Sequence, residues 1–154
     1  MSNTLQEFLG AAIVKAASDL ETAVLRLPED KRSWKPAETS RSALDQAAEC
    51  ALLNGSVAEL IVARKWREDY DFGKFELDKA ELARDWAALK ALLVENTSRV
   101  AATVRAVPDK DLAVEVLMPW GPMTMAQIIA YPYWNMAYHE GQINYLASMA
   151  GCLT

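Results

Sequence analysis

Apolar residues along the chain recur at helical spacing, and few stretches alternate as strands do. Between Thr4 and Leu27 they fall three and four residues apart, so they share one face of a predicted helix that Pro28 ends. A second predicted helix opens at Ser42, with Asp45 three residues on as its capping partner, and runs to about Lys65. Apolar residues nearly encircle this second segment, so we expect it to be the most buried helix.

Two more helices are predicted in the second half of the chain. The segment Leu77–Val107 carries a stripe of near-heptad spacing that includes Leu82, Trp86, Leu89 and Leu93, which is typical of a long antiparallel bundle. The last helix is expected from Thr124 to about Gly151. Pro132 lies inside it and is expected to kink or divide it, because proline removes one backbone hydrogen bond.

These four segments predict an all-α four-helix bundle forming a single domain over residues 1–154. The connections 28–41 and 108–123 are longer than the roughly 2–8 residues usual between bundle helices, so the order of the helices need not be simple up-down-up-down. Within the second connection, Leu112–Leu117 is a candidate extended piece.

Charge and cysteine content narrow the functional classes. The chain has 16 Lys plus Arg against 21 Asp plus Glu, a net charge of −5, which disfavours both nucleic-acid binding and adsorption to an anionic membrane. No apolar stretch reaches the roughly 18 residues of a membrane span, and the N-terminus does not resemble a signal peptide. Two cysteines, Cys50 and Cys152, make no disulfide framework. We therefore expect a soluble, cytoplasmic protein with neither a nucleic-acid nor a membrane partner.

Polar residues on two predicted helices mark a candidate site. Asn135, His139 and Gln142 lie at i, i+4 and i+7, so they form a polar track on an apolar face of the last helix. On the second helix, Glu49 stands alone among apolar neighbours. A carboxylate in such surroundings either becomes neutral or finds a cation, and His139 is the candidate neighbour, with or without a metal ion between them.

Three sequence patterns resemble the DinB (DNA-damage-inducible) superfamily: the segment from Ser42 to Asn54, Pro119-Trp-Gly-Pro-Met-Thr124 and Tyr138-His-Glu-Gly-Gln-Ile-Asn-Tyr145. The resemblance covers nearly the whole chain. It implies a four-helix bundle in up-down-down-up order, often assembled as a homodimer. It also implies a divalent metal held by one histidine of the second helix and two of the last, and, in some relatives, a low-molecular-weight thiol as co-substrate.

Carried over residue by residue, the metal site implied by the resemblance is Glu49, Asn135 and His139. Two of the three family histidines are replaced, leaving one imidazole, one carboxylate and one amide. Among Mn, Fe, Ni, Zn and Mg, this oxygen-rich set suits Mn, Mg or Fe better than Zn or Ni.

Two functions from different classes follow. The first is a divalent-metal-dependent enzyme, a thiol-dependent transferase or a hydrolase, in which the ion activates a bound thiol or water. The second is a non-catalytic small-molecule-binding or structural homodimer, with Glu49 and His139 as a buried pair and no metal. In either case, several aromatic residues could line a pocket for a small organic molecule, although such residues more often plug the ends of a bundle or bury a dimer interface: Trp34, Trp120, Tyr131, Tyr133, Trp134, Tyr138 and Tyr145. Tyr138 and Tyr145 are candidate proton donors to Glu49 or to a ligand. Cys50, flanked by apolar residues, is expected to be inert packing.

Overall fold

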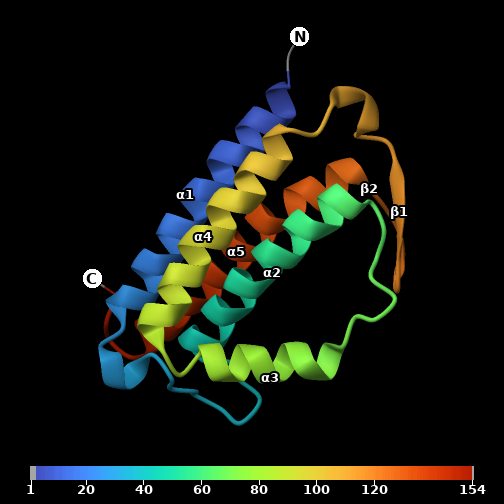
Figure 1. Ribbon diagram of the computed structural model, residues 1–154. Coiled ribbons are helices and arrows are strands. Elements are labelled where there is room, and N and C mark those ends of the chain that lie inside the picture. Colours follow the sequence, from blue (N-terminus) through green and yellow to red (C-terminus); the bar gives the residue numbers. More distant parts are fainter. Residues whose placement is uncertain (1–2, 154) are drawn as a thin grey trace.

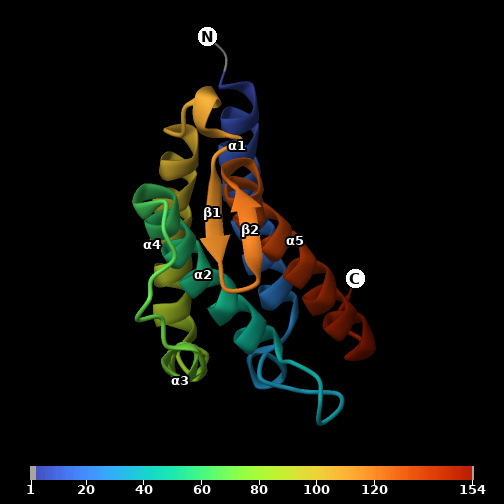
Figure 2. The same cartoon turned by 90° about the vertical axis from the view of Figure 1, so that its right-hand side faces the viewer.

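The computed structural model, which describes residues 3–153, is built around four long helices (Figure 1). They are α1 (Thr4–Arg26), α2 (Ala43–Ala63), α4 (Trp86–Arg105) and α5 (Met125–Met149). α1 and α5 run in one direction, and α2 and α4 run in the opposite direction (Figures 1 and 2). The prediction of an up-down-down-up four-helix bundle is therefore confirmed. No helix of the described residues is long and apolar enough to cross a membrane.

The predicted third helix is wrong in its extent. Instead of one helix over Leu77–Val107, a separate helix α3 (Phe72–Leu82) crosses the end of the bundle, and α4 begins at Trp86. Asp85 produces the break, because its carboxylate accepts a hydrogen bond from the Ala88 amide and so caps α4. Leu82 and Trp86 are four residues apart, so the apolar stripe continued across the break and concealed it. Parallel neighbours need such a crossover, and α3 provides it between α2 and α4.

The connection before α5 contains a small hairpin. Strands β1 (Glu115–Met118) and β2 (Gly121–Thr124) pair antiparallel, with Val116 opposite Met123. The predicted extended piece is thus present, shifted toward the C-terminus and paired. Gly121 has φ +119°, a conformation that residues with a side chain rarely adopt, which explains a glycine at the turn. Two 3-10 turns, η1 (Glu29–Lys31) and η2 (Asp109–Asp111), complete the loops.

The caps of α2 and α5 and the core packing follow the sequence pattern, whereas α1 begins after Asn3 without a side-chain cap. The Ser42 hydroxyl accepts from the Asp45 amide at the start of α2, and Thr124 and Gln127 form a reciprocal capping box at the start of α5. α5 is not divided at Pro132, which is itself buried; packing of the surrounding helix face offsets the roughly 3 kcal/mol cost of an interior proline. The core runs the length of the bundle and includes Ile13, Leu20, Leu89, Met136 and Ile143, each almost without exposed surface.

Candidate functional site

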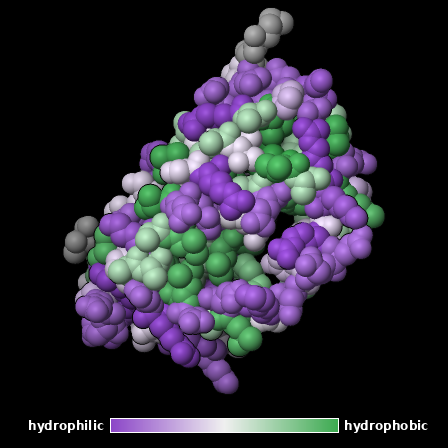
Figure 3. Space-filling model, in the orientation of Figure 1, coloured by the Kyte–Doolittle hydropathy of each residue, from purple (hydrophilic) through white to green (hydrophobic). Residues whose placement is uncertain are grey.

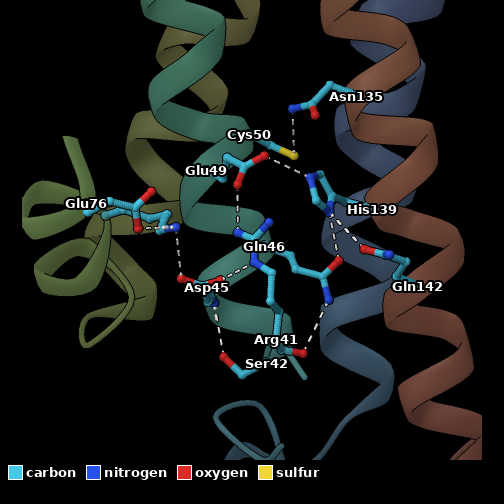
Figure 4. Close-up of polar contacts among 11 residues, drawn as sticks. Arg41, Ser42, Asp45, Gln46, Glu49, Cys50, Glu76, Asn135, His139 and Gln142 are labelled. Atoms are coloured by element: carbon cyan, nitrogen blue, oxygen red, sulfur yellow. Dashed lines mark hydrogen bonds and ion pairs between the residues drawn. The ribbon is translucent and has the colours of Figure 1, made fainter. Parts of the chain in front are cut away.

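Glu49 and His139 meet across the interface of α2 and α5, as their sequence context predicts. The Oε1 atom of Glu49 lies 2.9 Å from Nε2 of His139 (Figure 4). The histidine is buried and the glutamate side chain is 17% exposed. The structure therefore brings together two residues 90 positions apart in the chain.

Two glutamines hold the other side of the His139 ring. Nδ1 lies 2.7 Å from Oε1 of Gln46 and 3.2 Å from Oε1 of Gln142. The Gln46 amide nitrogen donates to the backbone carbonyl of Arg41, which turns its oxygen toward the ring. Both ring nitrogens thus face oxygen acceptors.

Arg41 is the site residue that the sequence analysis missed. It precedes the α2 cap, and its Nη2 lies 2.7 Å from Oε2 of Glu49, while its Nε donates to Asp45 at 2.5 Å. Burial by itself raises the pKa of Glu49, but the hydrogen bond from His139 and the charge of Arg41 outweigh it and hold that pKa at about 2. The signal was present in the sequence: Arg41, Asp45 and Glu49 recur every four residues, the spacing of neighbours along a helix.

Charged side chains form a cluster around Glu49 (Figure 4). Lys79 of α3 is buried, with its Nζ 3.5 Å from Asp45 and 2.7 Å from Glu76. The cations of Arg41 and Lys79 thus face the carboxylates of Asp45, Glu49 and Glu76. Because Glu49 also contacts His139, the cluster joins α2, α3 and α5.

Asn135, the third predicted metal ligand, points to a different neighbour. It is buried one turn from His139, and its Nδ2 lies 3.6 Å from Sγ of Cys50. Burial raises the pKa of Cys50 far above its usual range, so this sulfur stays a thiol, as expected of inert packing. The structure therefore pairs Glu49 with His139 and Asn135 with Cys50.

With the contacts they make in this structure, the donors at this site do not form a binding site for a divalent cation. Among residues 3–153, no three His, Cys, Asp or Glu side chains are grouped so as to hold a metal. The Nε2 atom of His139, which a metal would need, instead contacts Oε1 of Glu49 at 2.9 Å. The other oxygen of Glu49 is neutralised by Arg41, and Asn135 directs its amide nitrogen toward Cys50.

A pocket of about 600 Å³ opens beside the two glutamines that face Nδ1 of His139, although His139 itself does not line it. Polar groups of the 28–41 connection and of α2 and α5 contribute to its lining, among them Ser40, Arg41, Gln46 and Gln142. Tyr138 and Tyr145 also line it, and both are more than half exposed. Among the hydrogen bonds of the described residues, none joins either hydroxyl to Glu49, so a role for these tyrosines would be toward a ligand in the pocket.

Comparison with known proteins agrees with this architecture. The family model of the DinB superfamily matches residues 12–143. The chain belongs to the DinB superfamily. Comparison with curated proteins finds no match.

Two solved structures from Bacillus subtilis share the DinB fold. YfiT, described as a probable metal-dependent hydrolase with an unusual four-helix bundle topology, superposes with a TM-score of 0.78 at 17% identity, over 98% of this chain and 90% of YfiT. The DinB-like protein YjoA superposes with a TM-score of 0.66 at 17% identity, over 92% of this chain and 91% of YjoA. At this identity the likeness establishes the fold.

Proposed function

We propose that this DinB-superfamily protein binds a small polar organic molecule, without a metal ion, in the pocket beside His139. The observation that carries the proposal is that both carboxylate oxygens of Glu49 already contact protein groups. Oε1 lies 2.9 Å from His139 Nε2, and Oε2 lies 2.7 Å from Arg41 Nη2. A carboxylate with a protein donor or cation on both oxygens is a structural anion. It contacts both the guanidinium of Arg41, which lines the pocket, and the imidazole of His139, which lies behind Gln46 and Gln142.

The pocket lining supports a polar ligand. Amide groups of Gln46 and Gln142, the guanidinium of Arg41 and the hydroxyl groups of Ser40 and Tyr138 offer both donors and acceptors. The neighbouring carboxylates of Asp45 and Glu49 offset the Arg41 charge, so the lining selects by hydrogen bonding more than by net charge.

Metal content tests the first half of the proposal. Protein purified without a histidine tag, and the variant His139→Ala, would be analysed by mass spectrometry and melted with and without EDTA. We expect no stoichiometric metal in the parent, and a melting temperature that falls in His139→Ala by the same amount with or without the chelator. Stoichiometric metal in the parent that disappears in His139→Ala would overturn the proposal.

A pocket-filling variant tests the second half. A Cβ atom built on Gly141 meets nothing within 4 Å, and this residue lines the pocket, so Gly141→Trp places a large ring there without disturbing the core. Small polar compounds that bind the parent, detected by ligand-observed NMR in a panel of amino acids, sugars and nucleosides, are expected to lose binding in Gly141→Trp. Failure of every compound, or equal binding to both proteins, would contradict the assignment.

Metal-dependent hydrolysis is the second candidate function, because YfiT is described in those terms. The separation of 2.9 Å between Glu49 Oε1 and His139 Nε2 favours it, since adjacent ligands of one ion, at bond lengths of roughly 2.1 Å, lie about 3 Å apart. An ion on Glu49, His139 and Asn135 would have to replace the direct contact between Glu49 and His139 and offset the charge of Arg41. The metal analysis above distinguishes the two functions.

Two expectations from the family resemblance remain predictions, a homodimer and a low-molecular-weight thiol as co-substrate, and so does the cytoplasmic location expected from the sequence. Light scattering coupled to gel filtration would test the first. Titration with glutathione in the same NMR assay would test binding of one such thiol.

A further inference from the structure

A second cavity, of about 460 Å³, lies between α2, the connection 64–71, α3, the hairpin and α5. Its lining is dominated by rings: Trp66, Tyr70, Phe72, Phe75, Trp120 and Trp134. It shares no lining residue with the pocket beside His139. In the orientation of Figure 1, apolar residues also gather on the surface above α3 (Figure 3).

The rings come from separate elements and pack against one another. The Trp66 ring lies 4.8 Å from that of Tyr70 and 5.4 Å from that of Trp120, which sits at the hairpin turn. The ring centroid of Tyr70 in turn lies 4.7 Å from that of Phe72, the first residue of α3. Trp120 and Phe72 are still 63% and 56% exposed. A ligand in the cavity would cover aromatic surface that the fold leaves open to water.

The charged group in the lining of the cavity is negative. Glu76 is the charged residue among the side chains that line the cavity, and no Lys or Arg joins it among those described. Burial raises the pKa of Tyr131 in the wall, and the negative charge of Glu49 raises it further. Ring faces are themselves electronegative. An anionic ligand is therefore disfavoured and a cation is favoured.

We propose that this aromatic cavity is a binding site for an organic cation, an alkylammonium group attached to an apolar body. Aromatic faces attract quaternary ammonium groups, and Glu76 supplies a carboxylate at the rim. The carboxylate is also paired with Lys79 Nζ at 2.7 Å, so the rings contribute most of the attraction. The site is independent of the polar pocket and of the presence or absence of a metal at His139.

Matched probes test the charge preference. Benzyltrimethylammonium, choline and 3,3-dimethylbutan-1-ol, the uncharged analogue of choline with the same shape, would be titrated into the full-length protein by calorimetry and ligand-observed NMR. We expect saturable binding of both cations, with choline binding about tenfold more tightly than its neutral analogue. Equal binding of choline and its analogue, or no saturable binding of benzyltrimethylammonium, would overturn the proposal.

Variants then locate the site. Trp120→Ala removes an exposed ring at the hairpin turn, and we expect it to weaken benzyltrimethylammonium binding at least about fivefold. The matched control is Tyr133→Ala, which removes a partly exposed ring of α5 outside the cavity and is expected to leave binding unchanged. Unaltered binding in Trp120→Ala would refute the location. Gly141→Trp, which fills the polar pocket, is expected to bind the cation as the parent does, so failure of one site is distinguishable from failure of the other.

Discussion

Acid should destabilise this protein in part through Glu49, whose contribution to stability is lost as the pH falls from about 4.5 toward 2. Ionised Glu49 is stabilised by Arg41 and His139, and its pKa is held at about 2 instead of the ordinary 4.5. The informative change is Glu49→Gln, which keeps the shape of the side chain and removes the charge. The variant leaves Arg41 and His139 without their shared anion, so we expect it to be less stable than the parent at neutral pH.

The size of the effect follows from the two pKa values. A carboxyl whose pKa is lowered on folding stabilises the fold fully above the pKa of the unfolded chain, here about 4.5, and loses that contribution as the pH falls toward 2. The full shift corresponds to an upper bound of about 3 kcal/mol. Solvent screening at a partly exposed ion pair reduces this to roughly 1–2 kcal/mol.

Urea unfolding at a series of pH values between 7 and 2 measures this contribution. We expect the difference in unfolding free energy between parent and Glu49→Gln to be constant above about pH 5 and to shrink as the pH falls from there. Glu95→Gln is the control, because Glu95 is exposed on α4 and makes no ion pair among the described residues. If the parent and Glu49→Gln differ by the same amount at every pH, the charge on Glu49 does not stabilise the fold and the reasoning fails.

Two further predictions concern glycine and cysteine positions. Gly55→Ala should lower stability by about 1–2 kcal/mol in urea unfolding, since its Cβ would lie 2.7 Å from Nδ2 of Asn96, an amide held by the Ala51 carbonyl at 2.8 Å. Gly141→Ala should instead raise stability by about 0.5–1 kcal/mol, because alanine is more favourable than glycine inside a helix and the added Cβ atom contacts no other atom. A loss of stability in Gly141→Ala would show that the space around this position is not open. In a thiol-reagent assay on the folded protein, Cys152 should react while Cys50 stays protected until unfolding, because burial raises the pKa of Cys50; rapid modification of both thiols in the native state would refute this.

Local sequence patterns predicted the helices well where a capping residue or a proline marks the start or end of the helix. Pro28 ends the first helix, while Ser42 and Thr124 cap later ones as their partners three residues on suggested. The break before Trp86 escaped detection because a capping aspartate interrupted a stripe whose spacing continued unchanged. Similarly, a single residue pattern around Leu112–Leu117 could indicate an extended piece but not its partner strand, since pairing is a tertiary contact.

The candidate site also has features that the sequence predicts and features that depend on tertiary contacts. Sequence alone determined that Glu49 and His139 lie on inward faces of two helices, because helical periodicity places each among apolar residues. Only the tertiary structure decided what surrounds them. Arg41 reaches Glu49 from the end of a long loop, Lys79 arrives on a helix that the sequence pattern had merged with its neighbour, and Asn135 turns to Cys50. Those choices depend on how the helices cross and where the loops fold back, and the spacing of residues along one helix contains no information about either.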